Sequence, residues 1–150
     1  MRVRALAGVL LASAGLGLAA CGSDSTPLET GPIVGSWTLV EIDGQALPIT
    51  ETAIFQEWVC ELTLTELNIT FRSDRTYVGN DMVTRACIEG PTNDVPGEYE
   101  GTWRITANVL FMRERTGPEA ALVHHIEGSV LTIVGEDEDG TPIIQVLHRN

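Results

Sequence analysis

The stretch VGSWTLVEIDG at residues 34–44 predicts a strand that ends in a tight turn. Residues 34–42 are rich in β-branched side chains, which favour strands. Asp43-Gly44 follows at once, and an Asp-Gly pair at the end of a strand is a strong signal for a hairpin. The folded part of the chain is therefore expected to open with a hairpin whose short return covers residues 45–48.

Farther along, the apolar residues keep the two-residue period of a strand but change parity once. Because side chains alternate between the two faces of a strand, this change requires a bulge or a turn near Thr65-Glu66. Residues 49–57 carry no clear pattern and are expected to form a loop or one helical turn. The apolar residues fall first on even and then on odd positions: Ile54, Trp58, Cys60, Leu62, Leu64, then Leu67, Ile69, Phe71.

The remaining segments predict an all-β chain. No window of eleven residues or more has a helical period. Residues 88–98 hold two prolines and two glycines and are expected to be the longest irregular loop. Eight or nine short strands with close turns describe a sandwich or a barrel, and tight sequential hairpins favour an antiparallel up-and-down β-barrel of about eight strands. Further strands are expected at residues 76–78, 99–106, 109–115, 121–127, 130–135 and 142–148, with turns at 73–75, 107–108, 116–118, 128–129 and 136–140.

A Gly-x-Trp pattern occurs twice, as Gly35-Ser36-Trp37 and as Gly101-Thr102-Trp103. A glycine close to an indole lets the backbone bend tightly while the ring closes one end of a barrel. We therefore interpret Gly35, Trp37, Gly101 and Trp103 as structural plugs of the barrel. Direct stacking of the two indoles on a ligand is the alternative.

Three segments, 35–44, 67–77 and 101–110, resemble the small lipocalin-like domains of exported bacterial lipoproteins. The resemblance rests on a Gly-x-Trp opening strand with a hairpin, an apolar strand followed by a polar turn and an aromatic residue, and the second Gly-x-Trp. It implies a barrel over residues 33–150 rather than a particular activity. A META-like β-domain, another small fold of the cell envelope, is similar at this level and is the second choice.

The N-terminus has the pattern of an export signal. Arg2 and Arg4 precede an apolar run, 5–20, that is shorter than a bilayer-spanning helix. The ending Leu18-Ala19-Ala20-Cys21 resembles the lipobox of bacterial lipoproteins, which implies a signal peptide at 1–20 and lipidation of Cys21. An ordinary signal peptide and an uncleaved anchor are the alternatives.

Residues 21–32 are polar and rich in Gly, Ser and Pro, which predicts a flexible tether. Gly22 stands where an aspartate would favour retention in the inner membrane. The outer membrane is therefore favoured over the inner membrane as the place of the bacterial cell envelope where the lipid is held.

The two other cysteines, Cys60 and Cys87, form an even pair in a chain that is expected to be exported. A disulfide between them is the preferred interpretation, and two unrelated thiols or a metal pair are the alternatives. Closing a loop of this length contributes about 3 kcal/mol in the chain-entropy model.

Charge excludes several classes of partner. The chain has nine arginines, no lysine and 21 acidic residues, so its net charge is −12. Without Arg2 and Arg4 seven arginines remain and the net charge is about −14. Such a surface repels nucleic acid and anionic lipid head groups. Membrane association is therefore expected through the N-terminal lipid alone.

Residues suited to catalysis or metal binding do not form a recognisable pattern. His124 and His125 are adjacent, so a strand would point them to opposite faces, and His148 has no evident companion. The acidic run 136–140 suits a solvated turn better than a calcium loop. No nucleophile elbow is present, so we expect no catalytic residue, metal or cofactor, and an uncharacterised hydrolase is only the alternative.

These observations favour a binding protein, with a small apolar or amphipathic ligand in the mouth of the barrel. The ligand-contacting residues cannot be named from the sequence, although six aromatic residues could line a cavity. The rival hypothesis is a filled barrel, an envelope accessory protein or inhibitor, that binds a protein partner through its loops, chiefly residues 88–98. The six aromatic residues are Phe55, Trp58, Phe71, Tyr77, Tyr99 and Phe111.

Overall fold

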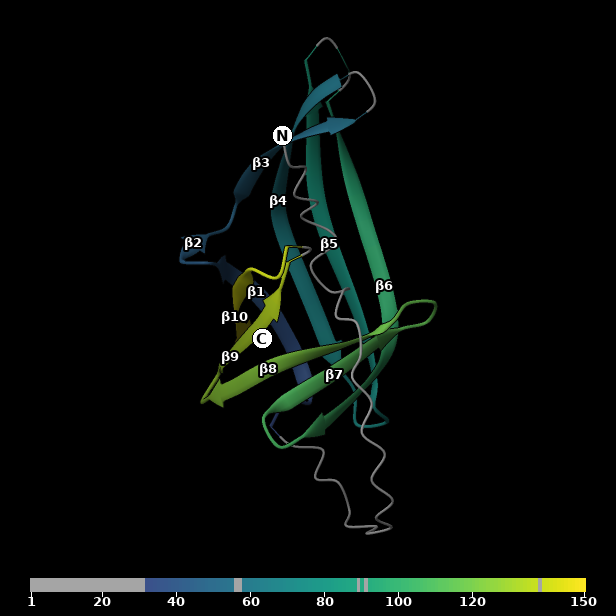
Figure 1. Cartoon of the computed structure of the whole chain (residues 1–150), viewed down its shortest axis with the longest axis vertical. Coiled ribbons are helices and arrows are strands. Elements are labelled where there is room, and N and C mark those ends of the chain that lie inside the picture. The colour runs from purple at the N-terminus through teal and green to yellow at the C-terminus, as the bar shows by residue number, and fades with distance from the viewer. Residues whose placement is uncertain (1–31, 56–57, 89, 91, 138) are drawn as a thin grey trace.

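The computed structural model describes residues 32–55, 58–88, 90, 92–137 and 139–150, and none of these residues is helical. The predicted signal peptide, Cys21 and nearly all of the predicted tether lie outside the described residues. The described chain forms ten strands (Figure 1): β1 Gly35–Ile42, β2 Gln45–Ala46, β3 Ile49–Phe55, β4 Trp58–Phe71, β5 Thr76–Cys87, β6 Thr92–Thr106, β7 Val109–Glu114, β8 Glu119–Glu127, β9 Val130–Glu136 and β10 Pro142–Arg149.

Eight of these strands close into an antiparallel barrel. Strands β4 to β10 pair in chain order, and β1 closes the ring because it pairs with β10 on one side and with β4 on the other. The short β2 pairs only with β1, and β3 pairs only with β4. The prediction of an all-β, up-and-down barrel of about eight strands is therefore confirmed, with β2 and β3 as two additional strands.

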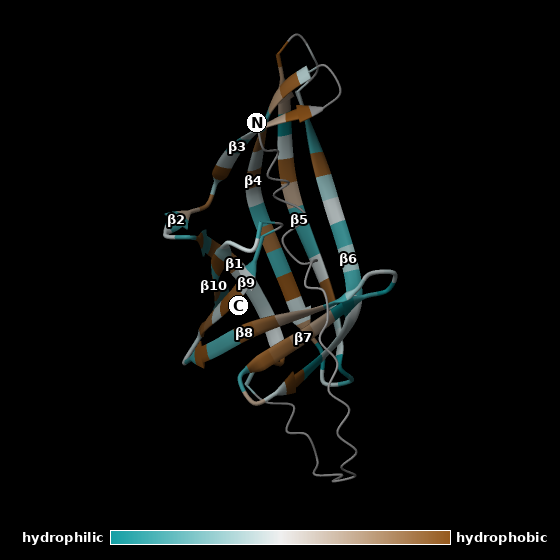
Figure 2. Cartoon of the chain, in the orientation of Figure 1, coloured by the Kyte–Doolittle hydropathy of each residue, from teal (hydrophilic) through white to brown (hydrophobic). Residues whose placement is uncertain are grey.

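Strand β4 changes its partner half-way along its length. Residues 68–71 pair with β1, whereas residues 58–64 pair with β3. A bulge lies between Leu64 and Glu66, where the parity change predicted it. The extra residue keeps Leu67, Ile69 and Phe71 on the same inner face as Cys60, Leu62 and Leu64, and Figure 2 shows the alternating hydropathy along β4 and β5.

Beyond this bulge, four strands continue past the closed ring as an open, curved sheet, which we call the extension (Figure 1). The extension comprises β3 and the paired residues 58–64 of β4, 83–87 of β5 and 92–95 of β6. It has two free edges, because β3 pairs with β4 alone and residues 92–99 of β6 pair with β5 alone among the described residues.

The expectation for residues 49–57 was wrong for most of that segment. Ile49–Phe55 is strand β3, and all seven of its residues pair with β4. The apolar residues of β3 alternate only weakly with polar ones, because the strand lies at an edge. Pairing with a long, regular neighbour therefore decides its conformation, and the local pattern does not.

The expected loop at residues 88–98 was also wrong. Strand β6 begins at Thr92, so only residues 88–91 connect it to β5. Pro96 has no N–H, and β6 tolerates it because its nitrogen points away from β5, toward the unpaired edge. This direction follows from Glu100, whose carbonyl points to the same side and accepts a hydrogen bond from Arg115. Backbone groups of residues four apart in a strand point the same way, so no hydrogen bond between β5 and β6 is lost.

The remaining turns lie where they were predicted. Asp43 and Gly44 both have positive φ between β1 and β2, and Ala107 has φ of 55° between β6 and β7. At the turn from β4 to β5, the Asp74 carboxylate accepts hydrogen bonds from the backbone N–H and the hydroxyl of Thr76. These bonds hold the pKa of Asp74 below its usual value.

The core lies inside the closed ring. Trp37, Phe71, Tyr77 and Trp103 fill its lower end, and the Phe71 and Trp103 rings pack edge to face with centroids 5.7 Å apart. No polar or charged residue is among the fully buried residues that the structure describes. The buried core residues are Ile33, Trp37, Leu39, Leu64, Ile69, Phe71, Tyr77, Trp103, Leu110, Met112, Ala120, Leu122, Leu131, Ile133 and Leu147.

Candidate functional site

The inner face of the extension is built from three rows of side chains that cross the sheet. The register places Ile49, Leu64, Val83 and Val95 in the row nearest the barrel. The middle row is Glu51, Leu62, Arg85 and Asn93. The outermost row is Ala53, Cys60 and Cys87. The middle row, which holds the only cationic side chain of these three rows, therefore lies between two apolar rows.

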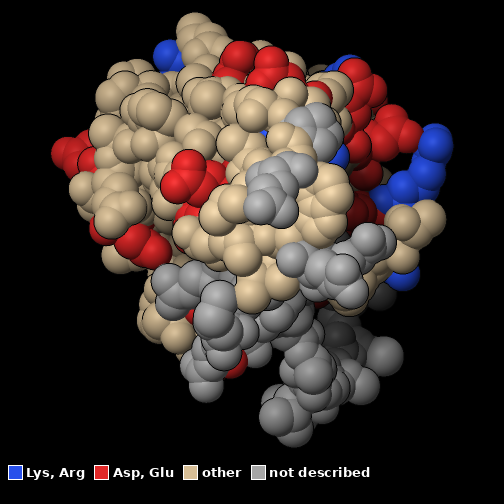
Figure 3. Space-filling view, turned by 90° about the horizontal axis from the view of Figure 1, so that it is seen from above, with Lys and Arg blue, Asp and Glu red and all other residues tan. Residues whose placement is uncertain are grey.

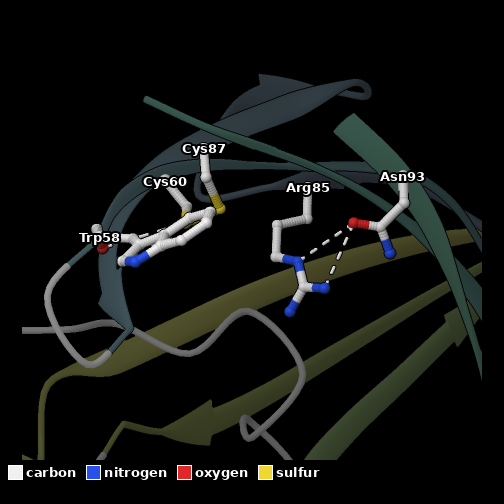
Figure 4. Close-up of a disulfide and its surroundings, with 5 residues drawn as sticks. All are labelled: Trp58, Cys60, Arg85, Cys87 and Asn93. Carbon is white, nitrogen blue, oxygen red and sulfur yellow. Dashed lines mark hydrogen bonds between the residues drawn. A yellow bond between two sulfur atoms is a disulfide. The ribbon is translucent and has the colours of Figure 1, made fainter. Parts of the chain in front are cut away.

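Arg85 is half-buried and is held by a neighbour in its own row. Its Nε and Nη2 donate hydrogen bonds of 3.3 Å and 3.2 Å to Oδ1 of Asn93. Figure 4 shows both side chains on the concave side of the curved strands, on the same side as the disulfide. No carboxylate of the described residues lies within salt-bridge distance of this guanidinium.

The predicted disulfide joins Cys60 and Cys87 directly across β4 and β5, with their Cα atoms 3.9 Å apart. Trp58 lies beside the disulfide (Figure 4). Its ring also covers Gly90, where an added Cβ would collide with the indole. The indole nevertheless remains 44 % exposed. The tip of the extension therefore combines a covalent crosslink with an accessible aromatic surface.

The two predicted tryptophans close the opposite end of the barrel. Trp37 is fully buried, and its Nε1 donates a 2.7 Å hydrogen bond to the carbonyl of Ile33. The Arg149 guanidinium lies 4.3 Å from the centre of the Trp37 ring. Gly35 has φ of 139°, and a Cβ there would stand 2.7 Å from Nη1 of Arg149, so glycine is required for this contact.

Trp103 is buried in the same end, and its Nε1 donates to the carbonyls of Arg72 and Thr76. Gly101 lies where β6 and β7 approach closely, since a Cβ there would collide with the carbonyl oxygen of Arg113. Both indoles thus bond to backbone carbonyls inside the barrel, and the structural interpretation of the Gly-x-Trp pairs fits these contacts better than ligand stacking.

Toward the open end, two side chains fill the space above glycines. The Tyr99 ring lies over Gly79, and the Asp81 carboxylate lies over Gly97, whose N–H it accepts. Burial raises the pKa of Asp81, and burial together with the nearby Asp81 charge raises the pKa of Tyr99 far above its usual range. The hydroxyl of Tyr99 is buried and has no hydrogen-bond partner among the residues that the structure describes. The upper barrel therefore contains two polar groups among apolar neighbours, whereas the lower barrel is apolar.

A cleft of about 540 Å³ lies on the rim beside this region, between the free part of β6 and the turn from β7 to β8. Glu98, Glu100 and Glu114 contribute three carboxylates, of which Glu100 pairs with Arg115 at 3.0 Å. Its volume suits a small ligand, and its lining combines apolar surface with these carboxylates and one arginine. The cleft is lined by Val78, Gly79, Asn80, Glu98, Tyr99, Glu100, Glu114, Arg115 and Thr116.

The aromatic residues expected to line one cavity are distributed over several places. Phe71 and Tyr77 belong to the packed core. Phe111 alternates with the inward-facing Leu110 and Met112, and the Arg104 guanidinium covers its ring at 3.6 Å, so it lies on the outer face. The side chain of Phe55 lies outside what the structure describes. Trp58 and Tyr99 are therefore the two that remain near open surface.

The histidines and the acidic run lie apart. His124 is half-buried, which lowers its pKa, and its Nδ1 lies 3.0 Å from the carbonyl of Asn108, whereas His125 and His148 are exposed. Asp137 anchors the turn from β9 to β10, because its carboxylate accepts the N–H groups of Asp139 and Thr141. No group of three or more His, Cys, Asp or Glu residues that could hold a metal ion occurs among the described positions.

Charge around the tip follows the composition of the chain. Seen from the tip of the extension, carboxylates are spread over the surface and cationic groups are few (Figure 3). The position of Arg85 is therefore unusual. The chain is strongly acidic and has nine arginines, and this one lies on the concave, largely apolar face of the sheet (Figure 4).

Comparison with known proteins adds no relative. Searches against protein-family models and against curated proteins find no match to this chain. Within the part that the structure describes, no helix is both long and apolar enough to cross a membrane. Function must therefore be argued from the geometry.

Sequence reasoning missed Arg85 and Asn93 as site residues. Both lie on strand residues that face inward, but Asn93 was assigned to the expected loop at 88–98. Continuing the odd-numbered inward positions of β5 past Tyr77 to residues 79, 81, 83 and 85 would have placed Arg85 on the inner face.

Proposed function

We propose that this chain is a non-enzymatic binding protein of the bacterial cell envelope. Its ligand is a small amphipathic molecule that lies against the inner face of the extension and the mouth of the barrel. The lower barrel is the support for this surface and holds no ligand. An N-terminal lipid at Cys21 would keep the protein at the membrane, with the outer membrane favoured.

The observation that carries this proposal is the uneven placement of exposed apolar side chains. Large exposed apolar patches on soluble domains commonly mark interaction sites. Five of the seven exposed large hydrophobic residues of the described chain belong to the tip and free edges of the extension, and only two belong to the barrel wall. The five are Ile54, Trp58, Val59, Ile88 and Val95, and the two are Val123 and Ile144. Strand alternation places Trp58 and Val95 on the inner face and Ile54 and Val59 on the outer face, so the choice of the inner face rests on Trp58 and Val95.

The packing of the barrel supports the choice of site. Trp37, Phe71 and Tyr77 are each no more than 1 % exposed, so the lower end is occupied by the protein's own side chains. Trp58 and Val95, by contrast, lie on the inner side of the extension and are 44 % and 40 % exposed. Burying this surface under a ligand tail would be favourable at about 25 cal/mol per Å².

The envelope location is supported by three features of the chain. The lipobox-like ending at Cys21 implies lipidation, and a disulfide such as Cys60–Cys87 persists in oxidising compartments. The acidic surface leaves the lipid as the means of membrane attachment. The resemblance to small bacterial lipocalin-like lipoproteins agrees with an eight-strand barrel, and a META-like domain is the second choice.

Binding of decanol, a neutral ten-carbon amphipath, tests the proposed function. The full chain is expressed in an oxidising compartment, and binding is measured by calorimetry and by native mass spectrometry. Val95→Asp places a charge on the inner face and is expected to weaken binding tenfold or more. Val123→Asp makes the same change at a 47 % exposed position of the outer barrel wall and is expected to have no effect. Equal binding by both variants, or no binding by the unmodified chain, would refute this site.

A second candidate function is docking of a protein partner at the tip, which replaces the expected docking loop at residues 88–98. Ile88 favours it, because this side chain is 69 % exposed at the turn between β5 and β6. Ile88→Ser should then remove partner capture while leaving decanol binding unchanged.

A further inference from the structure

Arg85 lies on the inner face of the extension, but its charge has no role in binding a neutral amphipath. We propose that the Arg85–Asn93 pair is a head-group subsite for a carboxylate, so that the ligand class is an anionic amphipath such as a fatty acid. This inference rests on the proposed function, because the ligand tail would occupy the same inner face.

The charge balance around Arg85 supports this assignment. The chain has 21 acidic residues and nine arginines, yet no carboxylate of the described residues pairs with this half-buried guanidinium. Glu51 belongs to the same row but lies two strands away, with Leu62 between them. Half-buried charges are usually paired, so an arginine that meets only a neutral amide is suited to pair with an incoming anion.

Asn93 fixes the orientation of the guanidinium without neutralising it. Its Oδ1 accepts from Nε and Nη2, which uses two of the five N–H groups of the arginine. Nη1 and the second proton of Nη2 remain, and they form the fork that binds a carboxylate through two parallel hydrogen bonds. A neutral partner that holds this fork in place reduces the entropy lost when an anion binds.

The rows on both sides of Arg85 suit the apolar part of the ligand. Val83 and Leu64 lie toward the barrel, and the Cys60–Cys87 disulfide lies toward the tip. Charge-assisted hydrogen bonds strengthen in such surroundings because little water competes for them. A tail that starts at Arg85 can therefore run along Val95 or toward Trp58 without meeting another cation of the described inner face.

The test uses the full chain and two probes of equal chain length, decanoate and decanol, at a pH where decanoate is ionised. The unmodified protein is expected to bind decanoate at least tenfold more tightly than decanol. Arg85→Gln keeps a hydrogen-bonding side chain and is expected to abolish this preference. Arg85→Lys keeps the charge and should retain part of it. The matched control is Arg113→Gln, which removes one charge from the exposed outer face of β7 and should leave the preference unchanged.

A second measurement separates the two proposals. Acetate, which has no tail, is titrated into the full chain while the side-chain Nε–H signals of its arginines are followed by NMR. A shift of the Arg85 signal, with none at Arg113, supports the anion subsite even if decanol does not bind, in which case the proposed function alone fails. Decanol binding without an acetate shift or a decanoate preference would overturn the subsite and leave the proposed function standing. An Arg85→Gln variant that keeps its preference for decanoate would also overturn the subsite.

Discussion

The closed barrel and the extension share three strands, β4, β5 and β6, yet they are stabilised differently. Fifteen buried side chains form one continuous core, and of these only Leu64 belongs to the extension. In the extension, Ile49, Ala53, Cys60 and Leu62 are buried outside that core, and a disulfide joins the two central strands. Closure of the sheet therefore stabilises the barrel, whereas the open extension is stabilised by a disulfide and leaves apolar surface exposed for binding.

The largest expected effect is a difference in unfolding free energy between two tryptophan-to-alanine variants, one in the barrel and one in the extension. Trp37→Ala removes a fully buried indole, its hydrogen bond to Ile33 and its contact with Arg149, and should cost about 3–5 kcal/mol of unfolding free energy. Trp58→Ala, at the exposed tip, should change it by only about 0.5 kcal/mol. Urea unfolding measures both values. Equal costs would show that the extension is part of the same packed unit.

The disulfide offers a sharper test, because its effect should be confined to one half. Replacing Cys60 and Cys87 together by Ala is expected to destabilise the extension by about 3 kcal/mol, through the lost constraint on the unfolded chain. Hydrogen exchange should accelerate in β3 and in residues 83–87, while amides of β7 to β10 keep their protection. Uniform acceleration throughout the chain would contradict the two-part description.

The smallest expected effect is a loss of stability at alkaline pH that arises in the barrel. Burial and the nearby Glu114 charge raise the pKa of Tyr77 to about 12. The unfolded chain releases this proton near pH 10, so the folded state holds more protons above that pH. This contribution to stability is complete below pH 10 and is lost as the pH rises toward 12. Thermal unfolding between pH 8 and 12 measures it, and Tyr77→Phe should reduce the decline, with the raised pKa of Tyr99 accounting for the part that remains. A variant with an unchanged decline would exclude Tyr77 as its source.

Much of the barrel could be predicted because its signals are local. Asp43-Gly44 marks a tight turn through backbone conformations that suit Gly and Asp, and the parity change at Thr65-Glu66 reveals a bulge because strand side chains alternate. Cys60 and Cys87 were paired by their even number in a chain whose N-terminal pattern predicts export. Each inference needed only neighbouring residues or a count.

The candidate site could not be predicted in the same way. Residues 88–98 contain Pro96 and Gly97, which usually indicate a loop, and only the unpaired edge of β6 makes them compatible with a strand. Arg85 became a candidate once Asn93 was placed beside it on the neighbouring strand. Such contacts depend on the register between β5 and β6 along their whole length, and the local sequence carries little information about that register.

The sequence by itself determined the strand class, most turns and the bulge, since each follows from local sterics or alternation. Tertiary structure alone decided that β1 joins β10 to β4, that four strands run beyond the ring, and that Arg85 lies on their inner face. The physical reason is that closure and register are set by pairing between distant segments, and the free energy of that pairing depends on the whole sheet.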